Sequence, residues 1–363
     1  MEMRRYVVVL AVLVLSAVHG QAWAQGLSSS LGLDGLQVQP LSKIYYKSLG
    51  LNLNFGIPAE QLLSPFIIEP QWGSLLDVFP LELKLTEGRL VVGEIGFQVT
   101  NGGRARGFAS IAASVPTTAG MESAVGPGIG TLTDQSHSWD GTGLQWWQID
   151  LGGAFKRDDT LEFLVGVKFE RTTLKLHGAA GYTYPLILIN PLRLIFVQNN
   201  ADTYGGDVQV NLTIPYVGVR LNNGYFRSTF RIGIAGANVT SPIRLTDSGV
   251  YHAFFFLGII GRSDLSEEAR YTFSNSGLYL DGSFEYDFDV SNGFGLTCWA
   301  QGTWMSIPGG GNVDLTGQST AGIFPLLGIF NFPPTSFWAS GSSRESGLSE
   351  YSLNIGIKGI LTF

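Results

Sequence analysis

Apolar and polar residues alternate with a period of two along much of this chain. Between residues 161 and 169 every second residue is apolar, while Glu162 and Lys168 occupy positions between them. Residues 208–216 and 278–290 alternate in the same way. Because successive side chains of a β-strand point to opposite faces, this period predicts strands with one apolar face. The same pattern runs over residues 350–363, far longer than a common globular strand of about 5–6 residues.

The connections between these segments are of two kinds. Short turn signals lie at residues 101–103, 156–159, 222–224 and 291–293, whereas long segments rich in Gly, Ser, Pro and Asn cover residues 116–142, 177–206, 237–276 and 308–348. Short turns on one side and long loops on the other are typical of a transmembrane antiparallel up-and-down β-barrel. The pattern therefore predicts an all-β barrel in an outer membrane, with periplasmic turns and extracellular loops.

Counting the segments gives nine strands in alternating directions. They are expected at Leu90–Thr100, Arg104–Val115, Leu144–Phe155, Leu161–Leu176, Val208–Arg220, Tyr225–Gly236, Leu278–Val290, Phe294–Met305 and Tyr351–Phe363. Both termini belong on the periplasmic side, so a tenth strand must precede Leu90. Val78–Thr86 is favoured because Glu87 and Gly88 suit a tight turn; Lys43–Phe55 competes with it. Using both gives twelve strands if another one lies around residues 251–260.

The N-terminus has the pattern of a secretory signal. Arg4 and Arg5 precede an apolar run over residues 6–18, and an A-x-A cleavage site follows at residues 22–24. The run is shorter than the roughly 18 apolar residues of a spanning helix. The sequence thus predicts a signal peptide at 1–24, a periplasmic or lumen-plugging segment at 25–75, and the barrel at 76–363.

Composition narrows the possible functions. Charged residues are 14% of the chain, against about 25% in average soluble domains, and 23 Phe, 13 Tyr and 8 Trp favour aromatic-rich sheet. A net charge of -7 argues against a nucleic-acid partner. The single cysteine, Cys298, excludes an internal disulfide and a cysteine-based zinc site. We expect no metal and no cofactor, and we place Cys298 on a lipid-facing surface.

The last strand carries a resemblance. An alternating C-terminal strand that ends on Phe resembles the β-signal of Gram-negative outer-membrane barrel proteins. Tyr351, Leu361 and Phe363 fit that signal, although Lys358 stands where its usual glycine is expected. The resemblance implies location in the outer membrane and insertion by the barrel assembly machinery. It does not indicate a functional family.

Charged residues on the polar faces are candidates for the lumen. A ten-stranded barrel should be narrow and largely filled by side chains. The expected lumen charges are Arg227, Arg231, Asp281, Glu285, Asp287, Asp289, Glu162, Lys168 and Glu170. Strand adjacency predicts Arg227 near Asp287 or Asp289, and Arg231 near Glu285. These charges suit either a structural ladder of ion pairs or a charge-selective constriction.

Candidates for catalysis are few. Asp134, His137 and Asp140 lie together in one predicted loop. An Asp–His pair at a barrel mouth resembles the omptins, ten-stranded outer-membrane proteases that activate water with such residues. That chemistry would also need inward carboxylates near the rim, and the omptin motifs are not matched here. We therefore predict that the protein is not an enzyme, with an omptin-like surface hydrolase as the weaker alternative.

Basic residues near the outer ends of strands suggest lipid partners. Arg89, Arg171 and Lys175 are expected on the outward face at the outer leaflet, where lipopolysaccharide phosphates could bind them. The leading hypothesis is a narrow, charge-lined channel that passes a small solute. The alternative is a closed structural or surface-interaction barrel that binds lipopolysaccharide or a partner through its long loops.

Overall fold

The computed structural model describes residues 37–55, 81–100, 104–125, 137–180, 187–189, 192–194, 202–253, 259–291, 294–324, 330–331, 335–343 and 347–361. Within these ranges every regular element is a strand, and none is a helix that could span a membrane. The strands are β1 (Gln37–Phe55), β2 (Leu81–Thr100), β3 (Ala105–Ser114), β4 (Thr117–Val125), β5 (His137–Lys156), β6 (Leu161–Ala180), β7 (Ile187–Ile189), β8 (Leu192–Leu194), β9 (Asp202–Asn223), β10 (Phe226–Ala253), β11 (Ile259–Ser291), β12 (Phe294–Pro308), β13 (Gly311–Phe324), β14 (Phe330–Asn331), β15 (Thr335–Ser343) and β16 (Gly347–Leu361).

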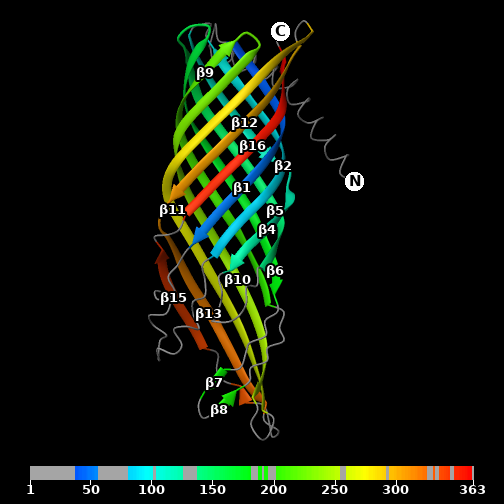
Figure 1. Ribbon diagram of the computed structural model, residues 1–363, viewed down its shortest axis with the longest axis vertical. Helices are drawn as coiled ribbons and strands as arrows, with labels where there is room; N and C mark the ends of the chain where they lie inside the picture. Colours follow the sequence, from blue (N-terminus) through cyan, green and yellow to red (C-terminus); the bar gives the residue numbers. More distant parts are fainter. Residues whose placement is uncertain are drawn as a thin grey trace, which may run out of the picture.

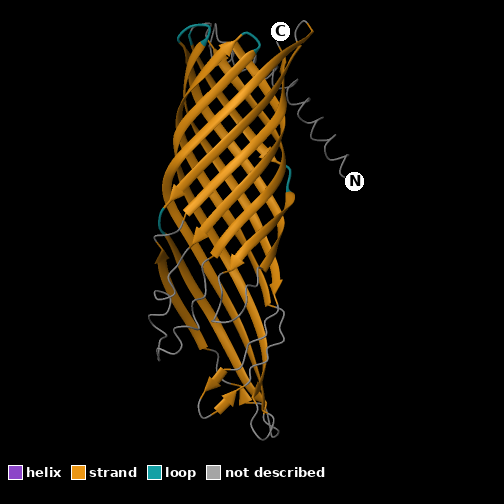
Figure 2. Cartoon of the chain, in the orientation of Figure 1, coloured by secondary structure: helices purple, strands orange, loops and turns teal. Residues whose placement is uncertain are grey.

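The long strands form one antiparallel sheet that closes on itself. β3 and β4 share one position between β2 and β5, and β12 and β13 share one beside β11. β1 pairs with both β2 and β16, which closes the ring (Figure 1). Figure 2 shows the strands running obliquely around the wall. The fold is the predicted all-β barrel with ten strands around the wall.

The favoured first strand is wrong. β1 covers Gln37–Phe55, the competing segment, and β2 continues through Glu87 and Gly88 instead of turning there. The register between β1 and β2 shifts between Leu49 and Leu51, so β2 holds an extra residue at a β-bulge. Part of the segment expected to lie outside the wall at 25–75 is therefore in the wall. The predicted signal peptide and residues 56–80 lie outside the described residues.

The predicted long loops are also partly wrong. β10 continues to Ala253 and β11 begins at Ile259, so both strands run through much of residues 237–276. The described residues within 251–260 thus belong to the ends of these two strands, and the wall has ten strands, so the twelve-stranded alternative is wrong. β13 and β15 likewise occupy residues assigned to the loop at 308–348. The barrel wall extends well past its membrane band.

Short turns lie at one end, as predicted. Asp158 accepts hydrogen bonds from the backbone amides of Thr160 and Leu161, at 2.9 Å each, and from the Thr160 hydroxyl at 2.6 Å. Gly224 follows β9 with φ of 58°, a conformation that favours glycine. The predicted turns at 101–103 and 292–293 lie outside the described residues. By the usual barrel arrangement, this end is periplasmic.

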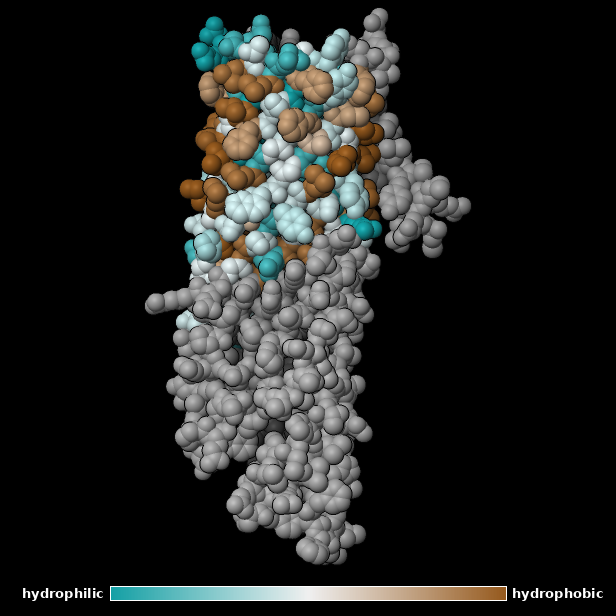
Figure 3. Space-filling view, in the orientation of Figure 1, coloured by the Kyte–Doolittle hydropathy of each residue, from teal (hydrophilic) through white to brown (hydrophobic). Residues whose placement is uncertain are grey.

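The outer wall near the periplasmic turns is apolar. Val217, Phe284 and Ile355 are 57%, 66% and 57% exposed, and all lie on the outer face. Figure 3 shows apolar side chains around this part of the wall, with hydrophilic side chains at the turn end. Trp304 and Tyr351 lie at the outer edge of the apolar surface, 45% and 54% exposed. Such a band, about 25 Å tall and edged by aromatic residues, faces lipid.

Beyond this band the polarity of the wall inverts. On β9 the apolar face, including Val210 and Leu212, points inward and is buried, while Asp207 is exposed on the outside. We call the inward-facing apolar cluster the extracellular core. It contains Leu49, Leu51, Leu53, Leu85, Leu90, Val92, Leu144, Leu174, Val208, Val210, Leu212, Ile214, Ala235, Ala237, Val239, Tyr271, Phe273, Met305, Ile307 and Leu348. The extended part of the barrel therefore resembles a soluble β-sheet structure, apolar inside and polar outside.

Candidate functional site

Charged side chains fill the lumen at the level of the membrane. At its centre Asp281 of β11 is 1% exposed and accepts a hydrogen bond from Lys168 of β6 at 3.1 Å. The Tyr279 hydroxyl donates to the same carboxylate at 3.0 Å, and Gln301 of β12 donates to it as well. Buried charges are tolerated when they are paired and hydrogen-bonded. Asp281 meets this condition with partners from three strands.

A second carboxylate extends this centre toward β5. Asp150 accepts a hydrogen bond from the Tyr216 hydroxyl at 2.7 Å. The Arg231 guanidinium lies between the two carboxylates, 3.8 Å from Asp150 and 3.6 Å from Asp281, and 5.2 Å from the centre of the Tyr216 ring. One arginine thereby links both acids.

Toward the extracellular side the last charged layer is built around Lys47. Its ammonium lies 3.7 Å from the Glu170 carboxylate, donates to the Ser352 hydroxyl at 3.3 Å, and sits 4.3 Å from the centre of the Trp146 ring. The Trp146 indole donates to Glu170. Glu350 is also buried in the lumen, 5% exposed. The extracellular core begins directly beyond this layer.

Toward the periplasm two further groups of charges complete the filling. Arg106 and Arg220 both approach Glu162, and Arg106 also donates to Gln98 at 2.8 Å. On the other side of the lumen, Glu285 lies 3.2 Å from Arg227 and 3.4 Å from Lys358. Together with the two inner layers these residues form what we call the lumen network. Its charged members are Lys43, Lys47, Glu94, Arg106, Asp150, Glu162, Lys168, Glu170, Arg220, Arg227, Arg231, Asp281, Glu285, Asp287, Glu350 and Lys358.

Three ion pairs of the network cross the lumen instead of running along the wall. Lys47 and Glu170 belong to β1 and β6, which have β2, β3 and β5 between them around the ring. Lys168 and Asp281 are separated by β9 and β10, and Asp150 and Arg231 by β6 and β9. Side chains from strands three or four positions apart around the ring therefore meet inside the lumen.

The predicted lumen charges lie largely where the sequence placed them, but one pairing is wrong. Arg227 pairs with Asp287, as predicted, and also with Glu285. Arg231 does not lie near Glu285; it stands opposite Asp281 in the ladder. β10 and β11 are joined at their extracellular ends, so their periplasmic turns do not fix the register. The side chain of Asp289 lies outside the described part.

Several members of the network were not predicted. Lys47 lies on β1, which was only the competing candidate for the first strand, and Glu350 was counted as part of the alternating terminal strand. Asp150 sits between Ile149 and Leu151, so its inward position was visible in the two-residue period. Tyr216 was counted with an apolar face. The sequence signal that could have found them is the alternation itself, which assigns every second residue of a strand to the lumen. Buried tyrosines weaken this signal because they look like members of an apolar, lipid-facing side.

The described part of the structure does not show the predicted catalytic candidates together in one site. Asp134 lies outside the described residues. His137 and Asp140 belong to β5 and not to a loop, in an uninterrupted ladder opposite Ser123 and Gly120. Three residues apart on a regular strand, the two positions lie on opposite faces. Their side chains, and that of His177, are outside the described part.

The candidates for lipid contact are all exposed. Arg171 donates to the Asn211 amide oxygen at 2.6 Å and lies 5.7 Å from the centre of the Trp147 ring, while Arg89 and Lys175 are exposed on β2 and β6. Cys298 is exposed on β12.

The residues of the insertion signal lie at the end of the chain. Tyr351 is exposed on β16, and Leu361 ends that strand. The Leu361 side chain and all of Phe363 lie outside the described residues.

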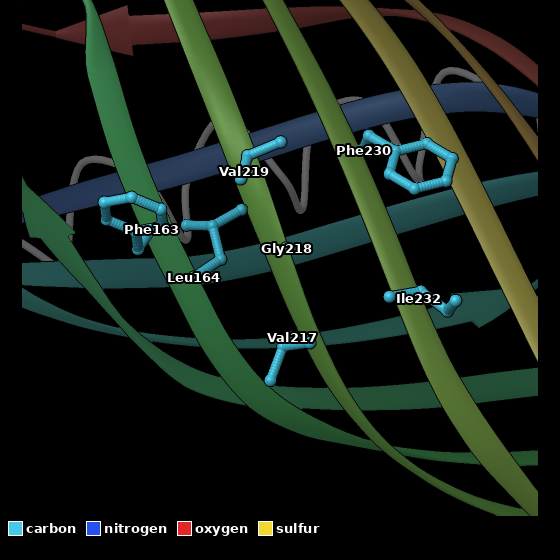
Figure 4. A pocket seen from close by; sticks show the side chains of 7 residues that line it. All are labelled: Phe163, Leu164, Val217, Gly218, Val219, Phe230 and Ile232. Carbon is cyan, nitrogen blue, oxygen red and sulfur yellow. The ribbon is translucent and has the colours of Figure 1, made fainter.

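A hollow of about 370 Å³ on the wall has no connection with this chemistry. Figure 4 shows its lining side chains on β6, β9 and β10. The lining residues are Phe163, Leu164, Val217, Gly218, Val219, Phe230 and Ile232. Val217 and Phe230 are 57% and 51% exposed on the outer face. The hollow lies within the apolar band, where acyl chains pack.

Comparisons with known proteins show the fold. No protein-family model matches the chain, and no curated protein sequence is similar to it. Among solved structures, the outer membrane protease OmpT from Escherichia coli matches with a TM-score of 0.51 and 11% identity, over 90% of this chain and 97% of that one. The Pseudomonas putida toluene transporter TodX matches with a TM-score of 0.32 and 10% identity, over 91% and 90%. The translocator domain of the autotransporter NalP from Neisseria meningitidis matches with a TM-score of 0.32 and 11% identity, over 97% and 98%.

The similarity in fold to OmpT and the apolar outer band of this barrel indicate the same class of protein. A closed barrel with a lipid-facing band, short turns at one end and long strands at the other is an outer-membrane β-barrel protein.

Proposed function

We propose that this protein is a sealed outer-membrane barrel that acts at its extracellular surface. The lumen network carries the proposal, because three of its ion pairs span the lumen between non-adjacent strands within the membrane. The extracellular core then fills the interior beyond it. A solute would have to displace both layers. The part of the barrel beyond the lipid-facing band is therefore the part that would bind external partners.

The narrow, charge-lined channel is the rival function. It requires Lys168 and Asp281 to separate, together with Arg231. Breaking a buried pair exposes an uncompensated charge, at a cost of about 3–5 kcal/mol. In a channel, the charges of the lumen network would determine which solutes pass. In this structure the same charges pair with one another and block the lumen.

Conductance in a planar bilayer tests the proposal. The chain without residues 1–24 is refolded, and its folding is shown by heat-modifiable gel mobility. We expect no stable conductance steps. Steps in the folded wild type, with an ion selectivity that changes in Arg231→Gln, would instead support the channel.

An enzyme is not part of this proposal. The test is hydrolysis of peptides by cells that display the protein, compared with His137→Ala. We expect the same background rate from both. A hydrolytic rate that disappears with this substitution would favour the surface hydrolase.

Lipopolysaccharide is the lipid partner that the outer wall suits best. Arg171 is held by Asn211 and Trp147 at the extracellular edge of the apolar band, where phosphates lie. We expect Arg171→Gln to weaken binding of purified lipopolysaccharide, with Arg157→Gln in a periplasmic turn as the matched control. If both variants bind lipopolysaccharide equally well, Arg171 does not contribute to lipopolysaccharide binding.

Insertion by the barrel assembly machinery is a separate part of the proposal. β16 lies at the closing seam against β1, and the insertion signal ends the chain beyond it. Removal of Phe363 should slow the appearance of the heat-modifiable form in cells. Unchanged assembly would show that the signal is dispensable.

A further inference from the structure

A small polar hollow interrupts the outer wall where β1, β12 and β16 meet. Its volume is about 140 Å³. The residues that line it are Asn52, Ser306, Ile307, Pro308, Gly347, Leu348 and Ser349. Asn52 stands opposite Ser349 in the ladder, and Ser349 stands opposite Ser306. Since directly opposed residues share a face of the sheet, these three polar side chains form one row on the outside of the barrel.

The hollow lies just beyond the lipid-facing band. A second row on the same outer face lies two residues nearer the periplasm on each strand. It consists of Gly50, Tyr351 and Trp304. A side chain at position 50 would overlap the Tyr351 ring, so the glycine lets this ring lie against the wall. Exposed Trp and Tyr mark the edge of a membrane. Two residues correspond to about 7 Å along a strand, which puts the hollow at the depth of the lipid headgroups.

One polar atom at the hollow has no partner among the described residues. Asn52 Oδ1 is buried and accepts no hydrogen bond there. An amide oxygen can accept two hydrogen bonds, and buried acceptors are normally satisfied. The residues lining the hollow are all uncharged. The donor that fits this place is therefore a neutral group that reaches the wall from the headgroup layer.

We propose that the hollow binds one edge of the glucosamine disaccharide of lipid A, the sugar headgroup of the outer leaflet. A sugar hydroxyl donates to Asn52 Oδ1, and the Ser306 and Ser349 hydroxyls are placed to bond its neighbours. The Tyr351 and Trp304 rings offer apolar faces on which the C–H side of a sugar can pack. A volume of about 140 Å³ suits the edge of one sugar ring and not the whole disaccharide. This site rests on the proposed binding of lipopolysaccharide, but it is separate from Arg171 and does not depend on the lumen being sealed.

Native mass spectrometry of the refolded chain in detergent tests the site. Lipid A is titrated against the wild type and against Asn52→Leu, which removes the amide at similar size. Phosphatidylglycerol serves as the acyl and phosphate probe without a glucosamine disaccharide. We expect Asn52→Leu to weaken lipid A binding about fivefold, the loss expected for one neutral hydrogen bond, with phosphatidylglycerol unchanged.

The matched control is Asn223→Leu, which removes an exposed amide at the periplasmic end of β9. It should bind lipid A as the wild type does. Ser349→Ala gives a second, milder change within the row and should weaken binding in the same direction. Heat-modifiable mobility confirms that each variant is folded. Unchanged lipid A binding in both Asn52→Leu and Ser349→Ala would mean that water alone fills the hollow and would overturn the site, as would an equal loss for phosphatidylglycerol.

Discussion

The two halves of the barrel interior have opposite chemistry on the same strands. Within the membrane β9 turns Arg220 and Tyr216 into the lumen, whereas beyond it the inward residues are Leu212 and Val208. The outer face changes in the opposite direction, from the lipid-facing Val217 to polar residues. A single strand thus serves as a membrane strand at one end and as a soluble strand at the other.

The difference shows what stabilises each half. The apolar outer face of the membrane half is buried in lipid, so the interior of this half is held together by backbone pairing and by satisfied charges. Water surrounds the extension, and burial of apolar side chains stabilises it as in any soluble sheet. Substitutions inside the two halves should therefore fail for different reasons.

The largest effect is expected at the centre of the lumen network. Asp281→Ala leaves Lys168 and Arg231 buried beside a missing carboxylate. The loss in the free energy of unfolding should be about 3–5 kcal/mol, measured by urea unfolding in lipid vesicles. A loss below about 1 kcal/mol would show that water already solvates these charges.

The extracellular core should respond to lost volume. Leu174 is 1% exposed, and Leu174→Ala should cost about 2–5 kcal/mol through lost burial and the cavity left behind. Its neighbour Lys175 is exposed on the opposite face, so Lys175→Ala is the matched control and should change stability by less than about 0.5 kcal/mol. Similar losses in the two variants would contradict an apolar interior at this height.

A smaller change tests single hydrogen bonds inside the network. Tyr216→Phe keeps the ring and removes only the hydroxyl that donates to Asp150 at 2.7 Å. We expect a loss of about 1.5–3 kcal/mol, because the acceptor is charged. Thr213→Val on the outer face of the same strand is the comparison variant. If Tyr216→Phe is as stable as the wild type, Asp150 must have another donor.

The smallest effect is expected at a periplasmic turn, outside both halves. Hydrogen bonds from the Thr160 hydroxyl and amide hold the pKa of Asp158 below its ordinary value, near 3.9 in unfolded chains. The stability that the carboxylate contributes is therefore full above about pH 4 and is lost as the pH falls further. Asp158→Ala should remove this acid dependence and lower the unfolding midpoint only slightly. A pH profile identical to that of the wild type would show that the turn does not contribute.

The sequence predicted the wall better than its first strand. Alternation located nine strands because each combines one apolar and one polar face. Leu49, Leu51 and Leu53 made β1 a competing candidate, but Val78–Thr86 was favoured because Glu87 and Gly88 looked like a turn. A β-bulge lets the next strand run through that point, and bulges carry little sequence signal. The extensions of β10, β11 and β13 were missed because the two-residue period does not show whether lipid or water surrounds a strand. Polar residues on the outer face of these extensions were therefore taken for loops.

The charges of the lumen could be predicted, but not their partners. Face parity placed Lys168 and Asp281 inside, yet strand adjacency would never pair β6 with β11. Such contacts depend on the width of the closed barrel and on the tilt of its strands. The row of Asn52, Ser349 and Ser306 was hidden for the same reason, since it needs the seam between the first and last strands.

Thiol labelling inside the lumen tests the sealed barrel most directly. Ser352 is 4% exposed and lies beside Lys47 in the outermost charged layer. A Ser352→Cys variant, made with Cys298→Ser, is treated with a small charged methanethiosulfonate reagent in vesicles, next to Asp207→Cys on the exposed outer face beyond the band. A sealed lumen predicts rapid labelling of Asp207→Cys and labelling of Ser352→Cys only after unfolding. Comparable labelling rates in the folded proteins would mean that an aqueous path reaches the lumen network, and the barrel would then be an open channel.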